Sequence, residues 1–119
     1  MGYYRILLVD DEEEVRKGIL RKMDWEKLGF QVAGDAENGE EALEKIEQLK
    51  PDVVMTDIRM PYMDGLTLTA RIRQKYPSMK VLIFSGYDDF EYAQQAIKLN
   101  VAEYILKPVN AVSYTHLTL

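Results

Sequence analysis

Four short apolar runs in this sequence end in polar residues that could take part in chemistry. Asp10 and Asp11 follow the run ILLV, Asp57 follows VVMT, Ser85 follows VLIF, and Lys107 follows EYIL. Carboxylate oxygens bind hard cations, and a hydroxyl and an amine can contact the oxygens of a phosphoryl group. The residue types therefore indicate a site for a cation and a phosphoryl group, in which one carboxylate attacks as nucleophile.

The composition excludes most other kinds of site. The 119 residues include no cysteine and one histidine, His116, so disulfides, thiolate zinc sites, thiol nucleophiles and multi-histidine sites are excluded. With 20 acidic and 15 basic residues, the formal net charge is -5, and no nucleic-acid surface is expected here. No apolar run approaches the ~18 residues of a membrane helix. We therefore expect a cytoplasmic protein with no membrane partner.

The elements that must position these side chains follow from the hydrophobic pattern. Apolar runs alternate with stretches of helical period, which predicts βαβ units around a parallel sheet. The predicted strands are residues 4–9, 30–36, 53–56, 80–84 and 103–106. The predicted helices carry apolar stripes made by Val15, Ile19 and Met23, by Ala42, Ile46 and Leu49, by Leu68 and Ile72, and by Ala93 and Ile97.

The predicted sheet should bring the polar strand ends together. In an open α/β sheet, ligands bind beyond the carboxyl ends of the strands. Three carboxylates gathered there repel one another, so they need raised pKa values or a bound cation, and oxygen ligands favour Mg²⁺ or Mn²⁺. Asp57 stands alone at the tip of the most continuously buried strand and is the preferred nucleophile, whereas Asp10 and Asp11 form a pair suited to a metal.

Each of these residues also has an ordinary structural interpretation. Asp10 or Asp11 could cap the helix that follows. Ser85 could be a turn serine, and Lys107 a solvated lysine. Their joint occurrence at four strand ends favours the site over the separate structural roles.

The motifs ILLVDDE, TDIRMPYMDG, the serine of FSGYDD and YILKP resemble, in order and spacing, the receiver domain of bacterial two-component response regulators. The resemblance covers residues 4 to about 110. It implies a flavodoxin-like, doubly wound α/β fold with a five-stranded parallel sheet of order 2-1-3-4-5 and flanking helices. We assign residues 1–110 to the receiver domain and 111–119 to a tail, which would leave the fifth helix short or disturbed. Whether this tail is native stays open.

The resemblance also implies a role for each acidic residue. Asp57 matches the phosphoacceptor and would also be a ligand of Mg²⁺ (or Mn²⁺), and Asp11 matches the direct acidic ligand of the metal. Asp10 matches a second acidic residue that reaches the metal through water. The third protein ligand would be the backbone carbonyl of Arg59.

Further residues match the switch and the rate-tuning positions of the family. Ser85 and Lys107 would contact the phosphoryl oxygens, and Tyr104 would rotate inward when Ser85 moves toward the phosphate. This switch would reshape the face made by the fourth helix, fifth strand and fifth helix. Arg59 and Tyr87 occupy positions that tune self-dephosphorylation. Neither is an acid or an amide, which predicts a long-lived phosphate.

The function that the resemblance implies is signalling. A sensor histidine kinase would phosphorylate the domain, which would act as an enzyme only in Mg²⁺-dependent self-phosphorylation and self-dephosphorylation. The stretches MDWEKLGF and SGYDDFEYAQQAIKLNVAEYILKPV resemble receivers joined to AraC-type helix-turn-helix output domains. DNA binding would then lie in a domain outside these residues, and a homodimer would form through the fourth helix and fifth strand.

Three other functions are compatible with part of this pattern. The alternative that stays open is a phosphorylation-independent dimerisation module of the same fold. A haloacid-dehalogenase-type phosphatase needs an acid two residues after its nucleophile, where this chain has Arg59. A flavodoxin-like electron carrier needs a hydroxyl-rich loop after the first strand to hold the FMN phosphate, where this chain has Asp10 and Asp11.

Overall fold

The computed structural model describes residues 2–85 and 103–106, with the backbone alone at residues 85 and 103–106. Strands and helices alternate along the described chain, as the hydrophobic pattern predicts. The elements are β1 (Tyr4–Val9), α1 (Glu13–Lys22), β2 (Phe30–Ala36), α2 (Gly39–Leu49), β3 (Val53–Asp57), α3 (Gly65–Lys75), β4 (Lys80–Ser85) and β5 (Glu103–Leu106).

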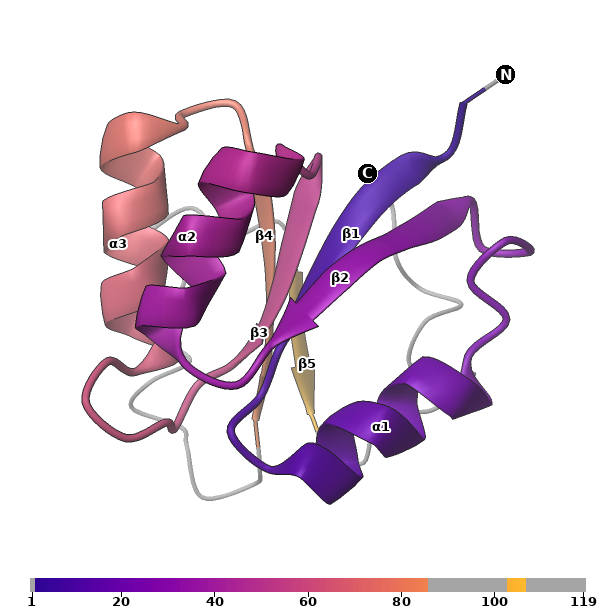
Figure 1. Cartoon of the computed structure of the whole chain (residues 1–119), viewed down its shortest axis with the longest axis horizontal. Helices are drawn as coiled ribbons and strands as arrows, with labels where there is room; N and C mark the ends of the chain where they lie inside the picture. Colours follow the sequence, from indigo (N-terminus) through magenta and orange to yellow (C-terminus); the bar gives the residue numbers. More distant parts are fainter. Residues whose placement is uncertain (1, 86–102, 107–119) are drawn as a thin grey trace.

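The strands form one parallel sheet in the order β2-β1-β3-β4-β5. Helix α1 covers one face of this sheet, and α2 and α3 lie side by side on the other (Figure 1). The chain runs outward from β1 to β2 and then returns past β1 to β3, so the direction of winding changes between β1 and β3. The carboxyl ends of these two strands are therefore neighbours at the switch point of the fold.

Each central strand contributes to two hydrophobic cores, because successive side chains of a strand point to opposite faces. On β1, Ile6 and Leu8 pack on the α1 side, whereas Leu7 and Val9 pack on the side of α2 and α3. The α1 core also contains Ile19, Met23, Trp25, Phe30, Val53, Met55, Leu82 and Phe84. The opposite core also contains Ala42, Ile46, Val54, Ile58, Leu68, Ile72, Val81 and Ile83. Burial on both faces explains why these strands read as continuous apolar runs.

The predicted elements agree closely with the described ones. β1, β2 and β5 have the predicted bounds, while β3 and β4 each extend one residue further. The extension arises because Asp57 and Ser85 still pair with Phe84 and Leu106 of the adjacent strands. Thus Asp57 belongs to the sheet and not to the loop after it. The predicted fourth and fifth helices and the tail 111–119 lie outside the described residues. Among the described residues, every helix is too short or too polar to cross a bilayer.

Candidate functional site

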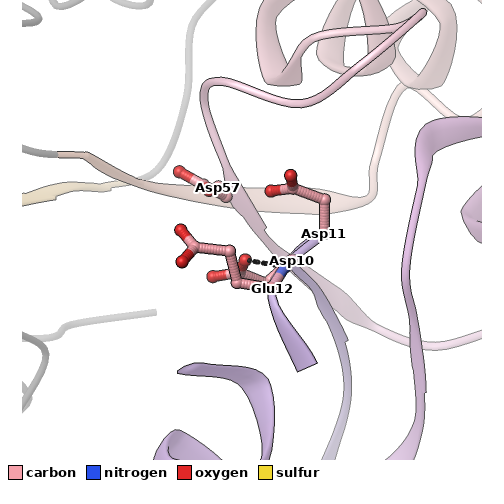
Figure 2. A group of neighbouring side chains, drawn as sticks. All are labelled: Asp10, Asp11, Glu12 and Asp57. Carbon is pink, nitrogen blue, oxygen red and sulfur yellow. Dashed lines mark hydrogen bonds between the residues drawn. The ribbon is translucent and has the colours of Figure 1, made fainter. Parts of the chain in front are cut away.

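Four carboxylates from two segments of the chain gather at the carboxyl edge of the sheet. Asp10, Asp11 and Glu12 follow β1, and Asp57 ends β3. The two segments meet because β1 and β3 are paired, with Val9 opposite Thr56. One oxygen from each of the four carboxyl groups lies within 4.8 Å of the others, and Figure 2 shows the four side chains around a common space.

The cluster has a buried and an open side. Asp10 is 0% exposed and Asp57 is 4% exposed, so both carboxylates are sheltered from water. Glu12 is exposed, and Asp11 is more accessible than Asp10. Among the described residues, the open side of the cluster is therefore the side of Asp11 and Glu12.

Asp10 is held by hydrogen bonds at three points. Its backbone N–H donates to the carbonyl of Ala36 at 3.1 Å, its Oδ1 accepts the N–H of Glu12 at 2.8 Å, and its carbonyl accepts Nη1 of Arg16 at 2.7 Å. The bond to Glu12 resembles the capping role considered above, although the N-cap residue of α1 is Glu12. A carboxylate has about four lone-pair sites, so this bond is compatible with metal binding.

Asp57 is fixed by the turn that connects β3 to α3. The N–H of Ile58 donates to Oδ1 of Asp57 at 2.8 Å, which sets the orientation of the carboxylate. The N–H of Gly65 then donates to the carbonyl of Ile58 at 2.7 Å. A Cβ on Gly65 would lie 2.3 Å from the carbonyl oxygen of Asp57. Only glycine therefore allows α3 to begin this close to the end of β3.

The donor set of the cluster fits a hard divalent cation. All four side chains offer oxygen, and none offers sulfur or nitrogen. Oxygen-only sites with several carboxylates favour Mg²⁺, Mn²⁺ or Ca²⁺ over softer metals. Carboxylates at these separations also repel one another, and a bound cation would offset that repulsion. The residues present therefore fit the group that the sequence predicts.

The structure brings together the three predicted acidic side chains, Asp10, Asp11 and Asp57. Arg59 lies two residues beyond Asp57, with an exposed side chain. The sequence prediction assigns metal binding to its backbone carbonyl and rate tuning to its side chain. The use of this carbonyl as a ligand stays a prediction.

The remaining predicted residues are described in part or not at all. The backbone of Ser85 ends β4, beside β3, and the backbone of Tyr104 lies in β5, opposite Ile83. Their side chains, together with Lys107 and Tyr87, lie outside the described residues. Their roles in phosphoryl binding, switching and rate tuning stay predictions.

Two contributors to the site were missed by the sequence interpretation. Glu12 joins the acidic cluster, although the sequence interpretation did not single it out; the third acid of the motif ILLVDDE was the available signal. Arg16 contacts the backbone of Asp10 and the carboxylate of Asp35. No local pattern marks Arg16, because its two partners come from the ends of two different strands.

Similar proteins share the sequence of this chain over most of its length. It is 45% identical over 107 residues to a Bacillus subtilis protein named as the uncharacterized transcriptional regulatory protein YesN, in an alignment that covers 90% of this chain and 29% of YesN. The chain therefore spans less than a third of this relative.

Solved structures share its fold. The REC domain of AraT, a response regulator from Geobacillus stearothermophilus, has a TM-score of 0.86 and 42% identity, over 94% of this chain and 87% of that chain. A two-component transcriptional regulator AraC from Clostridium phytofermentans has a TM-score of 0.83 and 38% identity, over 92% of this chain and 85% of that chain.

The family assignment agrees with the topology and with these likenesses. The sheet order and the positions of Asp10, Asp11 and Asp57 at the ends of β1 and β3 are those that the receiver resemblance implies. The family model described as the response regulator receiver domain matches residues 6–117, which is most of the chain. Sequence, fold and family model thus agree, and this chain belongs to the response regulator receiver domain family.

Proposed function

We propose that Asp57 accepts a phosphoryl group from a sensor histidine kinase and that this modification controls a transcriptional output. The observation that carries the proposal is the gathering of Asp10, Asp11, Glu12 and Asp57 around one space, with Asp57 buried at the end of a central strand. Carboxylates held together in this way are suited to bind a cation and to receive a phosphoryl group beside it.

In the transfer step, a carboxylate oxygen of Asp57 forms a bond to phosphorus. The bond from phosphorus to the donor's imidazole nitrogen breaks, and the imidazole keeps the electron pair. With acetyl phosphate as donor, the bond to the acyl oxygen breaks instead. The product is an acyl phosphate on Asp57. The hydrogen bond from Ile58 to Oδ1 holds the carboxylate in one orientation, which lowers the cost of reaching the in-line geometry.

The neighbouring residues would bind the cation and the phosphoryl oxygens. Asp10, Asp11, Asp57 and the carbonyl of Arg59 would hold Mg²⁺ or Mn²⁺. When bound, the cation would neutralise negative charge on the carboxylates and on the phosphoryl oxygens. Ser85 and Lys107 would contribute a hydroxyl donor and a positive charge to the same oxygens.

Phosphorylation would act on the rest of the domain through charge. The group adds about -1.5 to -2 charges at neutral pH, placed at the end of β3. Ser85 would move toward it and Tyr104 would follow. These movements would shift the equilibrium between two conformations of the face formed by the fourth helix and fifth strand. We infer a homodimer through that face in the phosphorylated state.

The output is inferred from the relatives. YesN is named as a transcriptional regulatory protein, and the Clostridium phytofermentans structure as a two-component transcriptional regulator AraC. Because the chain spans less than a third of YesN, DNA binding would belong to a separate AraC-type helix-turn-helix domain. The receiver itself is a signalling domain, and its own catalysis would be limited to gaining and losing the phosphoryl group.

The test is the intact mass of the purified domain after incubation with acetyl phosphate and Mg²⁺. We expect an increment of one phosphoryl group, which is absent from Asp57→Asn and from a sample treated with EDTA. Asp52→Asn is the matched control, because Asp52 immediately precedes the same strand at its other end, and it should be phosphorylated normally. No increment in the wild-type domain would contradict the proposal and favour a phosphorylation-independent dimerisation module.

The lifetime of the phosphate tests the two rate-tuning positions. Arg59 and Tyr87 carry no acid or amide to orient an attacking water, so we expect slow self-dephosphorylation. Following the phosphorylated mass after removal of acetyl phosphate gives the half-life. A half-life of seconds would show that these positions do not slow the reaction.

A further inference from the structure

Arg16 lies behind the acidic cluster, and its buried side chain connects three segments of the chain. The residue is 9% exposed and belongs to α1. Its Nη1 donates to the carbonyl of Asp10 at 2.7 Å in a buried hydrogen bond, and its Nε donates to Oδ2 of Asp35 at 2.6 Å. One guanidinium therefore connects α1 to the end of β1 and to β2 near its end.

The carbonyl that Arg16 binds belongs to the peptide unit between Asp10 and Asp11. Because a peptide unit is planar, fixing its oxygen fixes the plane that joins these two residues. The orientation of this plane influences where both Cα–Cβ bonds point, and therefore where both carboxylates lie. Arg16 contacts the backbone between the two predicted cation-binding residues.

A buried guanidinium is costly unless its hydrogen bonds are satisfied. Asp35 supplies a negative partner, with 11% of the Arg16 side chain and 38% of the Asp35 side chain exposed. Arginine suits this position because its planar fork donates in two fixed directions, which a lysine ammonium cannot reproduce. The pair therefore keeps the fork in place and directs one N–H to the Asp10–Asp11 peptide.

We propose that Arg16 is a positioning residue for the cation site, which holds the Asp10–Asp11 peptide so that both carboxylates can share one divalent cation with Asp57. The proposal rests on the proposed function only in assuming that the acidic cluster binds such a cation. Partners behind metal ligands commonly change metal affinity by about 10- to 100-fold when removed. We expect Arg16 to act within this range.

Positioning and simple electrostatics predict opposite effects for two substitutions. Arg16→Met removes a positive charge near the carboxylates, so electrostatics alone predicts tighter cation binding, whereas positioning predicts weaker binding. Asp35→Asn removes a negative charge but keeps an oxygen that accepts from Nε of Arg16. Electrostatics alone then predicts weaker binding, and positioning predicts little change. The signs of the two effects therefore separate the explanations.

The experiment measures Mn²⁺ binding directly, from the electron paramagnetic resonance signal of free Mn²⁺, with Mg²⁺ as competitor. We expect the dissociation constant to rise about 10-fold or more in Arg16→Met and to change less than about 2-fold in Asp35→Asn. Arg5→Met is the matched control, because the Arg5 side chain donates to the backbone carbonyls of Leu49 and Lys50 at the opposite edge of the sheet. It should bind Mn²⁺ like the wild type.

A second readout separates cation binding from a general loss of folding. In the acetyl phosphate reaction, Arg16→Met should need more Mg²⁺ for half-maximal rate but reach the wild-type rate at saturation. Circular dichroism and a urea midpoint for each variant show that it is folded. If Arg16→Met does not fold, Arg16→Lys takes its place, because it keeps the charge and loses the fork, and we expect weaker binding than in the wild type.

The outcomes distinguish the two proposals. The role of Arg16 is overturned if a folded Arg16→Met binds Mn²⁺ as tightly as the wild type or more tightly. If Arg16→Met does not fold, wild-type affinity in Arg16→Lys overturns it. Equal weakening in Arg5→Met overturns it as well. The failure of the wild-type domain to bind Mn²⁺ overturns the proposed function, and the role of Arg16 with it.

Discussion

Charged residues are arranged differently at the two ends of the parallel strands. We call the end where the strands finish the carboxyl edge and the end where they begin the amino edge. At the carboxyl edge, the oxygens of four carboxylates lie within 4.8 Å of one another. At the amino edge, opposite charges are paired or bonded to the backbone. Lys75 Nζ lies 2.6 Å from Oε1 of Glu47, and the N–H of Arg5 donates to Asp52 at 2.8 Å.

This difference separates a functional arrangement from a structural one. Gathering like charges costs stability, so the carboxyl edge has an arrangement that the fold alone does not favour. Exposed ion pairs such as Lys75–Glu47 cost little and contribute little. The same substitution of an acidic residue should therefore change the stability of the domain differently at the carboxyl edge and at the amino edge.

The largest effect is expected where the carboxyl edge is packed most tightly. Gly65→Ala would place a Cβ 2.3 Å from the carbonyl oxygen of Asp57, and relieving such overpacking should cost about 3 kcal/mol. Gly18→Ala is the matched control, because its added Cβ meets nothing within 4 Å apart from the adjacent residues and backbone of its own helix, and alanine in a helix interior should stabilise by about 0.5–1 kcal/mol. Urea unfolding measures both. Equal effects would show that the turn after Asp57 relaxes freely.

Removing one negative charge should raise the free energy of unfolding at the carboxyl edge and lower it at the amino edge. Two charges 4.8 Å apart repel by about 1–3.5 kcal/mol for an effective dielectric constant between about 80 and 20. Asp11→Asn should therefore stabilise the metal-free domain by about 1–2 kcal/mol. Asp52→Asn should destabilise it, because Asp52 accepts the N–H of Arg5 through a charged oxygen. Urea unfolding in EDTA tests this, and a destabilised Asp11→Asn would contradict the repulsion.

Cation binding should reduce the contrast between the edges. At a Mg²⁺ concentration about ten times the dissociation constant, binding to the folded state alone adds about 1.4 kcal/mol. Thermal unfolding with and without Mg²⁺ measures this as a rise in Tm for the wild type. We expect Asp11→Asn to lose most of the rise and Asp52→Asn to keep it. A rise of equal size in both variants would place the cation elsewhere.

The smallest effect is expected for the ion pair at the amino edge. The hydrogen bond and charge of Lys75 lower the pKa of Glu47 from its ordinary value of 4.5, and Glu47 raises the pKa of Lys75 from 10.5. The Glu47 contribution is present above the unfolded pKa and is lost as the pH falls through the lowered folded pKa. The Lys75 contribution is present below the unfolded pKa and is lost as the pH rises through the raised folded pKa.

Lys75→Met should therefore raise the pKa of Glu47 toward its ordinary value and leave stability at neutral pH almost unchanged. A carboxyl titration by nuclear magnetic resonance measures the pKa, and urea unfolding measures the stability. Arg21→Met, in the last turn of α1, is the control that should leave the pKa of Glu47 unaltered. A large loss of stability at pH 7 would show that the amino edge depends on this pair more than its exposure indicates.

Much of the fold was predictable because it depends on local periodicity. Strands covered on both faces must be apolar throughout, and this marks Val54 and Ile83 without knowledge of their partners. Each apolar stripe also identifies the face of a helix that packs on the sheet. The exact strand ends were less predictable, because pairing with a neighbour carries β3 through Asp57.

The structure brings the three predicted acidic side chains together. Strand order brings the ends of β1 and β3 together, so Asp10, Asp11 and Asp57 had to be close if the sheet was right. Glu12 was missed because a glutamate at this position also suits a helix beginning. Its entry into the cluster depends on the turn after β1, where the N–H of Glu12 binds the Asp10 carboxylate.

The order of residue types along the chain was enough to predict alternating strands and helices and three acidic residues at the strand ends, because the periods of strands and helices are local properties. The strand order followed from the resemblance to receiver domains. The tertiary structure was needed to show that Glu12 faces the same space and that Gly65 must lack a Cβ beside Asp57. It was also needed to join Arg16 to the Asp10–Asp11 peptide and to Asp35. These contacts join segments that no short pattern relates, and their geometry exists only once the strands and helices have packed.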